Sequence, residues 1–222
     1  RFKVCCIASE KEARLATEAG ASALGLVSEM PSGPGVISED EIARIAGVAP
    51  PGVSTFLLTS KQDAAWIVKQ GRRCRTDTIQ IVDSLVQEEP AKIRQGLPGV
   101  RLVQVIQVRG ERSIGEAMRA ARWADAILLD SGLPEGAIKE LGGTGRRHDW
   151  ALSARIREAI SPVPMWLAGG LKPENVLEAI ETVRPFGLDV CTGLRTDGAL
   201  DPDKLARFAA AVAEWNQASA LR

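Results

Sequence analysis

The sequence predicts an α/β fold: a single (β/α)8 TIM-barrel domain over residues 1–222 with a parallel eight-stranded core. Three observations predict it. A chain of 222 residues with 45% hydrophobic content can bury one substantial core. Short apolar runs recur eight times along the chain, and helical patterns separate them. Eight such units fit a closed barrel better than an open doubly wound sheet, which usually has fewer strands.

The eight runs are apolar on consecutive residues, which is typical of parallel strands buried on both faces. They are residues 2–7, 23–27, 53–58, 78–82, 102–106, 126–129, 164–167 and 187–190. We expect these segments to form the wall of the barrel.

The segments between the runs carry signals of helix starts and ends. Ser9 with Glu12 places a hydroxyl and a carboxylate three residues apart, so the pair can satisfy free N–H groups at a helix start. Proline follows Lys172 and Asp201, where its missing N–H costs nothing in a first helical turn. Glycines after amphipathic stretches predict left-handed helix ends. These glycines are Gly20, Gly71 and Gly96.

Composition excludes several classes of partner. Twenty-eight basic residues balance twenty-eight acidic ones, so no net field gathers nucleic acid or an anionic membrane. No apolar stretch approaches the roughly 20 residues that cross a bilayer, and the N-terminus lacks the apolar core of a signal peptide. The four cysteines have no metal-ligand spacing. We expect no metal, reduced thiols and a cytoplasmic location.

In a barrel of this class the active site forms at the carboxyl ends of the strands. Asp130 directly follows four apolar residues, so its carboxylate stands where strand packing gives way to the cleft; a helix cap is the alternative interpretation. Cys5 stands near the end of the first run, where a buried apolar role is the alternative. These two residues are the candidates for acid/base chemistry.

Side-chain alternation in the first run places Lys3, Cys5 and Ile7 on one face and Val4 and Cys6 on the other. If the first face is the barrel interior, Lys3 helps to stabilise a Cys5 thiolate. Alternation then points Cys6 away from the site.

Glycines after the seventh and eighth runs predict a phosphate site. Bare backbone N–H groups and a short helix N-terminus hold phosphate at this place in many barrels. Ordinary turns are the alternative. The residues expected to bind phosphate are Gly169, Gly170, Thr192 and Gly193.

Motifs in order along nearly the whole chain resemble the phosphoribosylanthranilate isomerase family. Residues 3–7 read Lys-Val-Cys-Cys-Ile and resemble the family's Lys-Val-Cys-Gly-Ile start. The further segments that resemble the family are residues 18–27, 127–131, 142–145 with 149–150, 167–171 with 173–176, and 189–193.

The resemblance implies an Amadori rearrangement of a phosphorylated ribosylamine of anthranilate, without metal or organic cofactor. It implies that Asp130 is the general acid that opens the sugar ring and that Cys5 is the general base at C2′. It also implies that a loop with Gly143, Gly145 and Asp149 closes over the sugar. The expected partner is therefore a phosphorylated sugar-amine substrate, and the chain is expected to be a monomer or a homodimer.

The chain departs from the family pattern near the substrate's aromatic end. Cys6 replaces a glycine, Gly35 stands at the family's carboxylate-binding arginine, and Val82-Asp83 replaces His-Gly. We expect Gly35 and Asp83 to weaken binding of the anthranilate carboxylate, and Gly35→Arg to improve it. Arg109 and Arg195 are alternative cations for that carboxylate. The alternative functions are an isomerase of a different phosphorylated aminoaldose and a non-catalytic phosphosugar-binding barrel.

Overall fold

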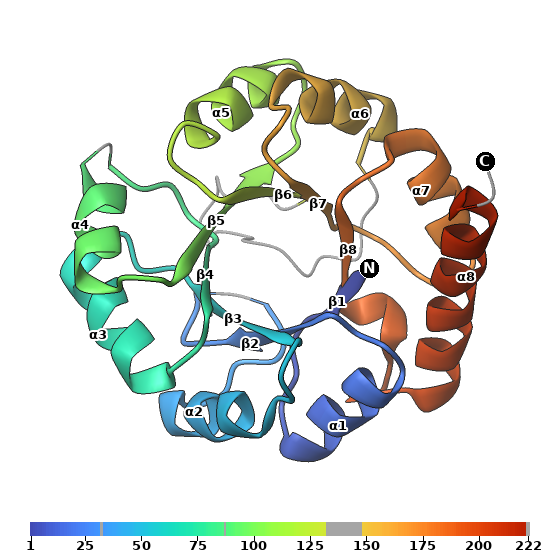
Figure 1. The fold of residues 1–222 in the computed structure, drawn as a ribbon, viewed down its shortest axis with the longest axis horizontal. Helices are drawn as coiled ribbons and strands as arrows, with labels where there is room; N and C mark the ends of the chain where they lie inside the picture. The colour runs from blue at the N-terminus through green and yellow to red at the C-terminus, as the bar shows by residue number, and fades with distance from the viewer. Residues whose placement is uncertain (32, 87, 132–147, 221–222) are drawn as a thin grey trace.

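The computed structural model describes residues 1–31, 33–86, 88–131 and 148–220, and within them the chain forms a closed parallel barrel (Figure 1). The strands are β1 (Phe2–Val4), β2 (Ala23–Val27), β3 (Ser54–Thr59), β4 (Thr78–Ile81), β5 (Arg101–Gln107), β6 (Ala126–Asp130), β7 (Met165–Leu167) and β8 (Gly187–Val190). Each strand lies within or overlaps one of the eight predicted runs. The (β/α)8 fold class is confirmed.

Eight helices of the described chain surround the strands as an outer ring (Figure 1). They are α1 (Glu10–Glu18), α2 (Glu39–Val48), α3 (Ala64–Cys74), α4 (Glu89–Gly96), α5 (Arg112–Ala120), α6 (Trp150–Ala159), α7 (Val176–Val183) and α8 (Pro202–Ala220). Between β8 and α8 the chain adds a 3-10 turn, η1 (Thr192–Leu194), and a small hairpin of β9 (Arg195–Thr196) and β10 (Ala199–Leu200). In the described part of the chain, no helix is both long and apolar enough to cross a bilayer.

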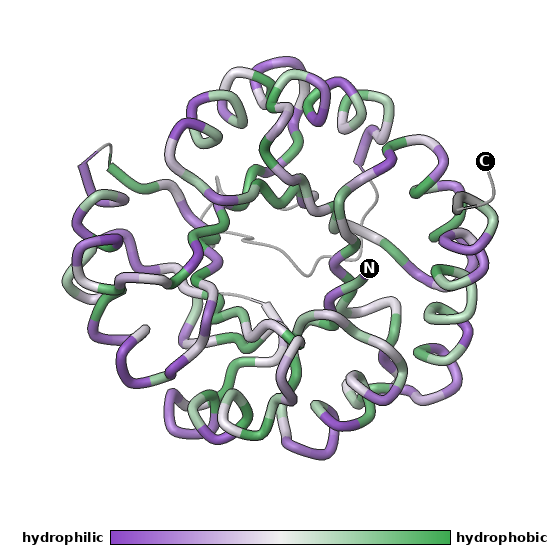
Figure 2. The backbone as a smooth tube through the Cα atoms, in the orientation of Figure 1, coloured by the Kyte–Doolittle hydropathy of each residue, from purple (hydrophilic) through white to green (hydrophobic). Residues whose placement is uncertain are grey.

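Two apolar layers explain why the strands are hydrophobic on both faces. One layer lies between strands and helices and includes Leu57, Ile79 and Ile127. The other fills the barrel interior and includes Phe56 and Leu128. Figure 2 shows hydrophobic segments concentrated along the barrel wall, with hydrophilic ones mainly on the surrounding helices and loops. Burial on both faces removes the polar alternation of a half-exposed strand.

A buried ionic cluster joins strands across the barrel interior. Lys3 on β1 is fully buried, and its Nζ lies 3.0 Å from Asp189 Oδ2 on β8 and 2.5 Å from Gln80 Oε1 on β4. The same ammonium lies 4.9 Å from the centre of the Phe56 ring. Burial alone lowers the pKa of Lys3, but the Asp189 carboxylate together with the nearby Cys5 and Cys6 outweighs burial and leaves the pKa raised. The charged Lys3 side chain therefore links β1 to β8 through an ion pair.

The predicted helix starts are confirmed in two of three cases. The Ser9 hydroxyl accepts the N–H of Glu12 at 3.2 Å, and Asp201 accepts the N–H groups of the first turn of α8. The start predicted at Lys172-Pro173 is wrong, because α7 begins at Val176 and the proline lies in the preceding turn. Proline fixes a φ that suits turns as well as first helical residues.

The predicted helix ends are confirmed at Gly20, which follows α1 with a φ of 91°. Gly71 is a wrong prediction, because it lies inside α3. A Cβ on Gly71 would come within 2.6 Å of Leu97 Cδ1. Gly96 is the last residue of α4, and a Cβ there would come within 2.5 Å of Val68 Cγ2. Both glycines allow α3 and the end of α4 to pack closely, which is a steric role and not a capping role.

Candidate active site

A pocket opens at the carboxyl ends of the strands and encloses about 710 Å³, including its mouth. Five of the residues predicted from sequence line it, and they come from β1, β6 and the loops after β7 and β8. They are Cys5, Asp130, Gly169, Gly170 and Thr192.

Cys5 directly follows β1, and its side chain points into the barrel interior as predicted. Its backbone N–H donates to Val190 O at 2.8 Å, which fixes the thiol beside β8. Room for the thiol comes from Gly25 on β2, where a Cβ would lie 2.8 Å from Cys5 Sγ. The thiol is therefore held in one place at the floor of the pocket.

The predicted placement of Cys6 and Ile7 is wrong. Cys6 has a φ of 62°, a left-handed conformation that ends the strand geometry after only three residues. The turn brings Cys6 to the pocket beside Cys5 and sends Ile7 into the layer between strands and helices. Alternation fails here because it holds only while the backbone stays extended.

Asp130 closes β6, and the protein packed around its carboxyl group removes most of its hydration while leaving it open to the pocket. Burial raises the pKa of Asp130 to about 6, although the N–H of Ser131, 2.7 Å from Oδ1, acts in the opposite direction. Near neutral pH, a carboxyl group with this pKa is protonated in a fraction of the molecules. It can therefore act as a general acid.

Close backbone approach shapes the predicted phosphate side of the pocket. Gly169 and Gly170 have φ values of 84° and 67°, which disfavour any residue with a Cβ. A Cβ on Gly193 would lie 1.9 Å from Leu171 O, so the loops after β7 and β8 touch through bare backbone. Asn175 fixes the first loop, because its amide donates to Gly170 O at 2.9 Å.

The remaining predicted residues belong to the segment before α6. Asp149 is the N-cap of α6 and accepts the N–H groups of Ala151 and Leu152 at 2.9 and 3.2 Å. Its expected role over the sugar stays a prediction. Gly143 and Gly145 lie outside the described residues.

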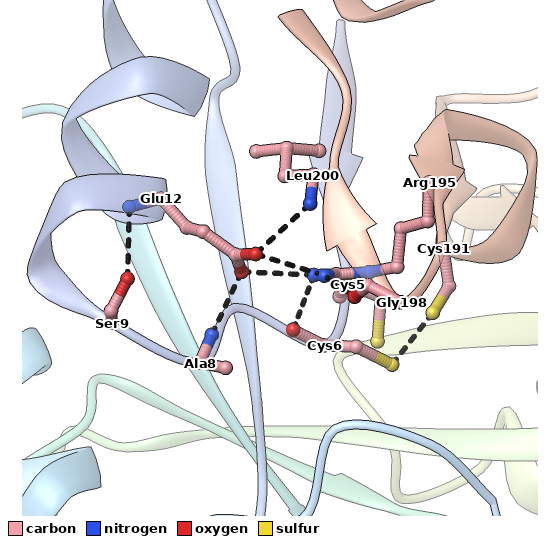
Figure 3. A network of polar contacts seen from close by, with 9 residues as sticks. All are labelled: Cys5, Cys6, Ala8, Ser9, Glu12, Cys191, Arg195, Gly198 and Leu200. Carbon is pink, nitrogen blue, oxygen red and sulfur yellow. Dashed lines mark hydrogen bonds and ion pairs between the residues drawn. The ribbon is translucent and has the colours of Figure 1, made fainter.

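Arg195, a candidate cation for the substrate, is bound to the protein itself (Figure 3). Its guanidinium forms an ion pair with Glu12 at 2.9 Å and donates to the carbonyls of Cys6 and Gly198. Burial alone raises the pKa of Glu12, but Arg195 and the N–H groups of Ala8 and Leu200 together outweigh burial and leave the pKa lowered. The ion pair joins α1 to the hairpin before α8, and the hydrogen bond to the Cys6 carbonyl holds the turn after β1 against the same hairpin.

The side of the pocket lined from β2 to β5, which we call the apolar wall, is mostly apolar among the described residues, with Gln80 as its polar side chain. It is formed by Val27, Met30, Pro34, Leu58, Val82 and Val105. Val82 faces the pocket, whereas Asp83 caps its own turn by accepting the N–H of Ser84 at 2.8 Å. Gly35 has a φ of 79°, and a Cβ on it would lie 2.4 Å from Cys6 Cβ. Gly35→Arg therefore cannot enter this loop without displacing Cys6.

Asp189 is a site residue that sequence reasoning did not single out. One carboxylate oxygen binds Lys3, while the other, Oδ1, is buried and has no hydrogen-bond partner among the described residues. Asp189 also lines the pocket, and a buried oxygen without a partner is uncommon outside functional sites. A lysine in the first apolar run and an aspartate in the last were the signal in the sequence, because such charges are buried only when paired.

Comparisons with known proteins agree with this geometry. A family model described as N-(5′-phosphoribosyl)anthranilate (PRA) isomerase matches residues 2–211. The N-(5′-phosphoribosyl)anthranilate isomerase of Methanothrix thermoacetophila is 35% identical over 208 residues, which cover 94% of this chain and 95% of the relative. The crystal structure of the enzyme from Thermotoga maritima has a TM-score of 0.82 at 29% identity, covering 96% of this chain and 98% of that one.

A further solved structure is a phosphoribosyl anthranilate isomerase in complex with reduced 1-(o-carboxyphenylamino)-1-deoxyribulose 5-phosphate. It has a TM-score of 0.80 at 26% identity, and the match covers 96% of this chain and 98% of that one. The family resemblance suggested by the motifs is confirmed over almost the whole chain. The chain belongs to the N-(5′-phosphoribosyl)anthranilate isomerase family.

Proposed function

We propose that the chain isomerises N-(5′-phosphoribosyl)anthranilate to 1-(o-carboxyphenylamino)-1-deoxyribulose 5-phosphate, a step of tryptophan biosynthesis. The observation that carries the proposal is one pocket that holds both a thiol and a carboxyl group with a raised pKa. Cys5 enters from β1 and Asp130 from β6. A sugar bound in the pocket between β1 and β6 of the barrel is within reach of both a general base and a general acid.

Protonated Asp130 donates to the furanose ring oxygen, and the C1′–O bond breaks to give a protonated Schiff base. The Cys5 thiolate then removes the proton at C2′, and the electron pair of that bond moves into the Schiff base to give an enolamine. Tautomerisation returns a proton to C1′ and yields the ketose. Because the protonated Schiff base is itself the electron sink, the proposal needs no metal or organic cofactor.

Substrate binding is divided between the two sides of the pocket. The backbone around Gly169, Gly170, Thr192 and Gly193 is proposed to hold the phosphate through N–H donors, which need no net positive charge on the chain. Asp189 Oδ1 is proposed to accept a hydrogen bond from a sugar hydroxyl. The apolar wall receives the aromatic ring.

The test is a fluorescence assay with substrate generated in place from anthranilate and phosphoribosyl pyrophosphate by a phosphoribosyltransferase. The chain should speed the loss of substrate fluorescence above spontaneous decay. Cys5→Ala and Asp130→Asn should each lower kcat by at least about 10²-fold, the usual scale for losing a positioned proton-transfer group, with little change in stability. Absence of acceleration by the folded wild type would overturn the proposal.

A second candidate, an isomerase of a different phosphorylated aminoaldose, is favoured by Gly35 and the apolar wall. A carboxylate that enters an apolar cleft without a cation loses hydration worth several kcal/mol. The assay is therefore repeated with the phosphoribosyl derivative of aniline, which lacks the carboxylate. A higher kcat/KM for the aniline derivative supports this second function, and a higher value for anthranilate rejects it.

The cysteines bear on the location of the chain, and a solved relative bears on its assembly. All four cysteines are free thiols, which persist in a reducing cytoplasm, and we infer that location. One solved relative from Thermotoga maritima is described as dimeric, while monomers were generated from it. For this chain monomer and homodimer stay open, and light scattering after size-exclusion chromatography measures the state directly.

A further inference from the structure

Two thiols that the proposed reaction does not use meet between the ends of β1 and β8. Cys6 and Cys191 are 185 positions apart in the chain, yet their Sγ atoms form a hydrogen bond at 2.7 Å. Figure 3 shows the two side chains pointing toward one another, each from its own loop. Both residues border the pocket. Neither is assigned a part in proton transfer or phosphate binding.

The surroundings of the pair give the two thiols different pKa values and different exposure. The hydrogen bond between the two thiols lowers the pKa of Cys191 against the opposing effect of burial, and the nearby Arg195 guanidinium lowers it further. The same hydrogen bond raises the pKa of Cys6. Cys191 is also the more exposed of the two, and Cys6 is only 4% exposed. A thiol with a lowered pKa that borders the pocket, next to a more buried thiol with a raised pKa, is the arrangement of a reactive and a resolving cysteine.

Cys74 provides the contrast within the same chain. It is buried on α3, and burial raises the pKa of its thiol to about 12. Glu39 beside it acts in the same direction. A thiol in such surroundings stays protonated and unreactive at neutral pH.

We propose that Cys6 and Cys191 are a redox site that hydrogen peroxide converts to a reversible intrachain disulfide, which switches off the pocket. Cys191 sulfur attacks one peroxide oxygen, the O–O bond breaks, and the leaving hydroxide takes a proton to become water. Cys6 sulfur then attacks the Cys191 sulfenic acid, the S–S bond forms, the S–O bond breaks, and a second water leaves with the Cys6 proton. Two thiols are oxidised and one peroxide is reduced. An added dithiol reverses the reaction by thiol–disulfide exchange.

The bridge alters the site because it connects the two loops that carry it. A disulfide has an S–S length of about 2.0 Å, so the sulfurs must approach from 2.7 Å. Cys6 cannot move alone, because Arg195 binds its carbonyl and Gly35 packs against it. The displacement therefore extends to Cys5 on one side and Thr192 on the other. Misplacing a reacting group by a fraction of an ångström to about 1 Å lowers turnover by up to about 10²-fold.

The experiment treats the reduced full chain with hydrogen peroxide, blocks the remaining thiols with an alkylating reagent, and maps disulfides by peptide mass spectrometry. We expect a bridge between the peptide with Cys6 and the peptide with Cys191. Because Cys5 shares a peptide with Cys6, the mapping is repeated in Cys5→Ala, which should keep the bridge. The bridge should be lost in Cys6→Gly, a variant that suits the positive φ of that position. Cys74→Ser is the matched control for removal of a buried thiol and should keep the bridge.

Activity is measured in parallel, each variant relative to its own reduced form. Wild type and Cys74→Ser should lose at least about tenfold in kcat on oxidation and recover with dithiothreitol, while Cys191→Ser should lose much less. This arm rests on the proposed function, but the mapping does not. If the reduced chain shows no isomerase activity, the proposed function fails and the mapping still decides whether the pair forms the disulfide.

Three outcomes overturn the redox site. The first is a bridge that includes Cys5 or Cys74 in place of Cys6. The second is equal inactivation of Cys191→Ser, which would assign the loss to oxidation of Cys5. The third is a fully formed Cys6–Cys191 bridge with unchanged kcat, which would show that the disulfide does not regulate the activity.

Discussion

At the scale of single residues, the raised pKa of Asp130 sets an expected pH profile. A general acid works only while it holds its proton, and burial raises the pKa of this group to about 6. As pH rises through about 6 the proton is lost, so kcat/KM should fall about tenfold for each further pH unit on that limb. The profile is measured with buffers of constant ionic strength. Asp130→Asn should have low activity without this limb, and an unchanged limb in that variant would assign it to another group.

Cys6 and Gly35 form a second residue-scale unit. Cys6 adopts a positive φ and fills the space that a Cβ on Gly35 would need. Gly35→Ala should therefore destabilise the fold by about 1–3 kcal/mol, the usual cost of overpacking and strain. In a Cys6→Gly background the contacts with Cys6 Cβ and Sγ are removed, so much of the packing part of that cost should be relieved, while Cys6 Cα stays 2.9 Å from the added Cβ. Urea unfolding of the two single variants and the double variant measures the coupling, and simple additivity would contradict the proposed contact.

The same contact changes what is expected of Gly35→Arg. The sequence alone predicts improved binding of the anthranilate carboxylate, because arginine restores a cation. The structure adds a steric barrier at Cys6. Improvement is therefore expected in the Cys6→Gly, Gly35→Arg double variant and not in Gly35→Arg alone.

At the scale of elements, the strands could be predicted because burial on both faces leaves continuous apolar runs. Residues 23–27 and 187–190 match β2 and β8 at both ends. The first run was predicted too long, since nothing in the apolar pattern shows that Cys6 turns the chain. The prediction that Gly71 and Gly96 end helices fails for a related reason. In a sequence, a glycine that makes room for a neighbouring helix cannot be distinguished from one that ends a helix. Contacts between elements decide both cases, and one sequence does not contain them.

The start of α6 offers an element-scale prediction. Asp149 accepts two N–H groups of the first turn, and removal of such a cap costs about 1 kcal/mol. Asp149→Ala should lower the free energy of unfolding by about that amount, whereas Asp149→Asn should retain most of it. Urea denaturation measures both variants. If kcat falls while the stability of Asp149→Ala is unchanged, the role predicted for Asp149 over the sugar is the better account.

At the scale of the whole molecule, the candidate site follows from the fold more than from any single motif. Cys5, Asp130 and the glycine loops were found because barrel chemistry gathers at the carboxyl ends of the strands. Asp189 was missed because its role depends on a partner from the opposite end of the sequence. The Cys6–Cys191 pair was missed for the same reason. Residue types and strand order predict where a site is, and pairings across the barrel require the structure.

The Lys3–Asp189 pair gives a whole-molecule prediction, because it ties β1 to β8 inside the barrel. Lys3→Met leaves a carboxylate buried without its cation, which should cost about 3–5 kcal/mol of unfolding free energy. The double variant Lys3→Met, Asp189→Leu removes both charges and should recover most of that loss. Equilibrium urea unfolding of wild type and both variants measures the effect. If the double variant is as unstable as Lys3→Met, the ion pair itself stabilises the fold and does more than neutralise a buried charge.

The seam between β1 and β8 also bears on how the barrel assembles. Every other pairing in the wall joins consecutive strands, while this one joins the two ends of the strand order. Closing a longer loop costs more chain entropy, so contacts between neighbours in sequence form before contacts between the ends. We therefore expect the growing sheet to stay open until Phe2 to Val4 dock on Leu188 to Val190. Cys5, Cys6, Val190 and Cys191, at the ends of these two strands, line the pocket, so we expect a binding-competent site only after this pairing closes the barrel.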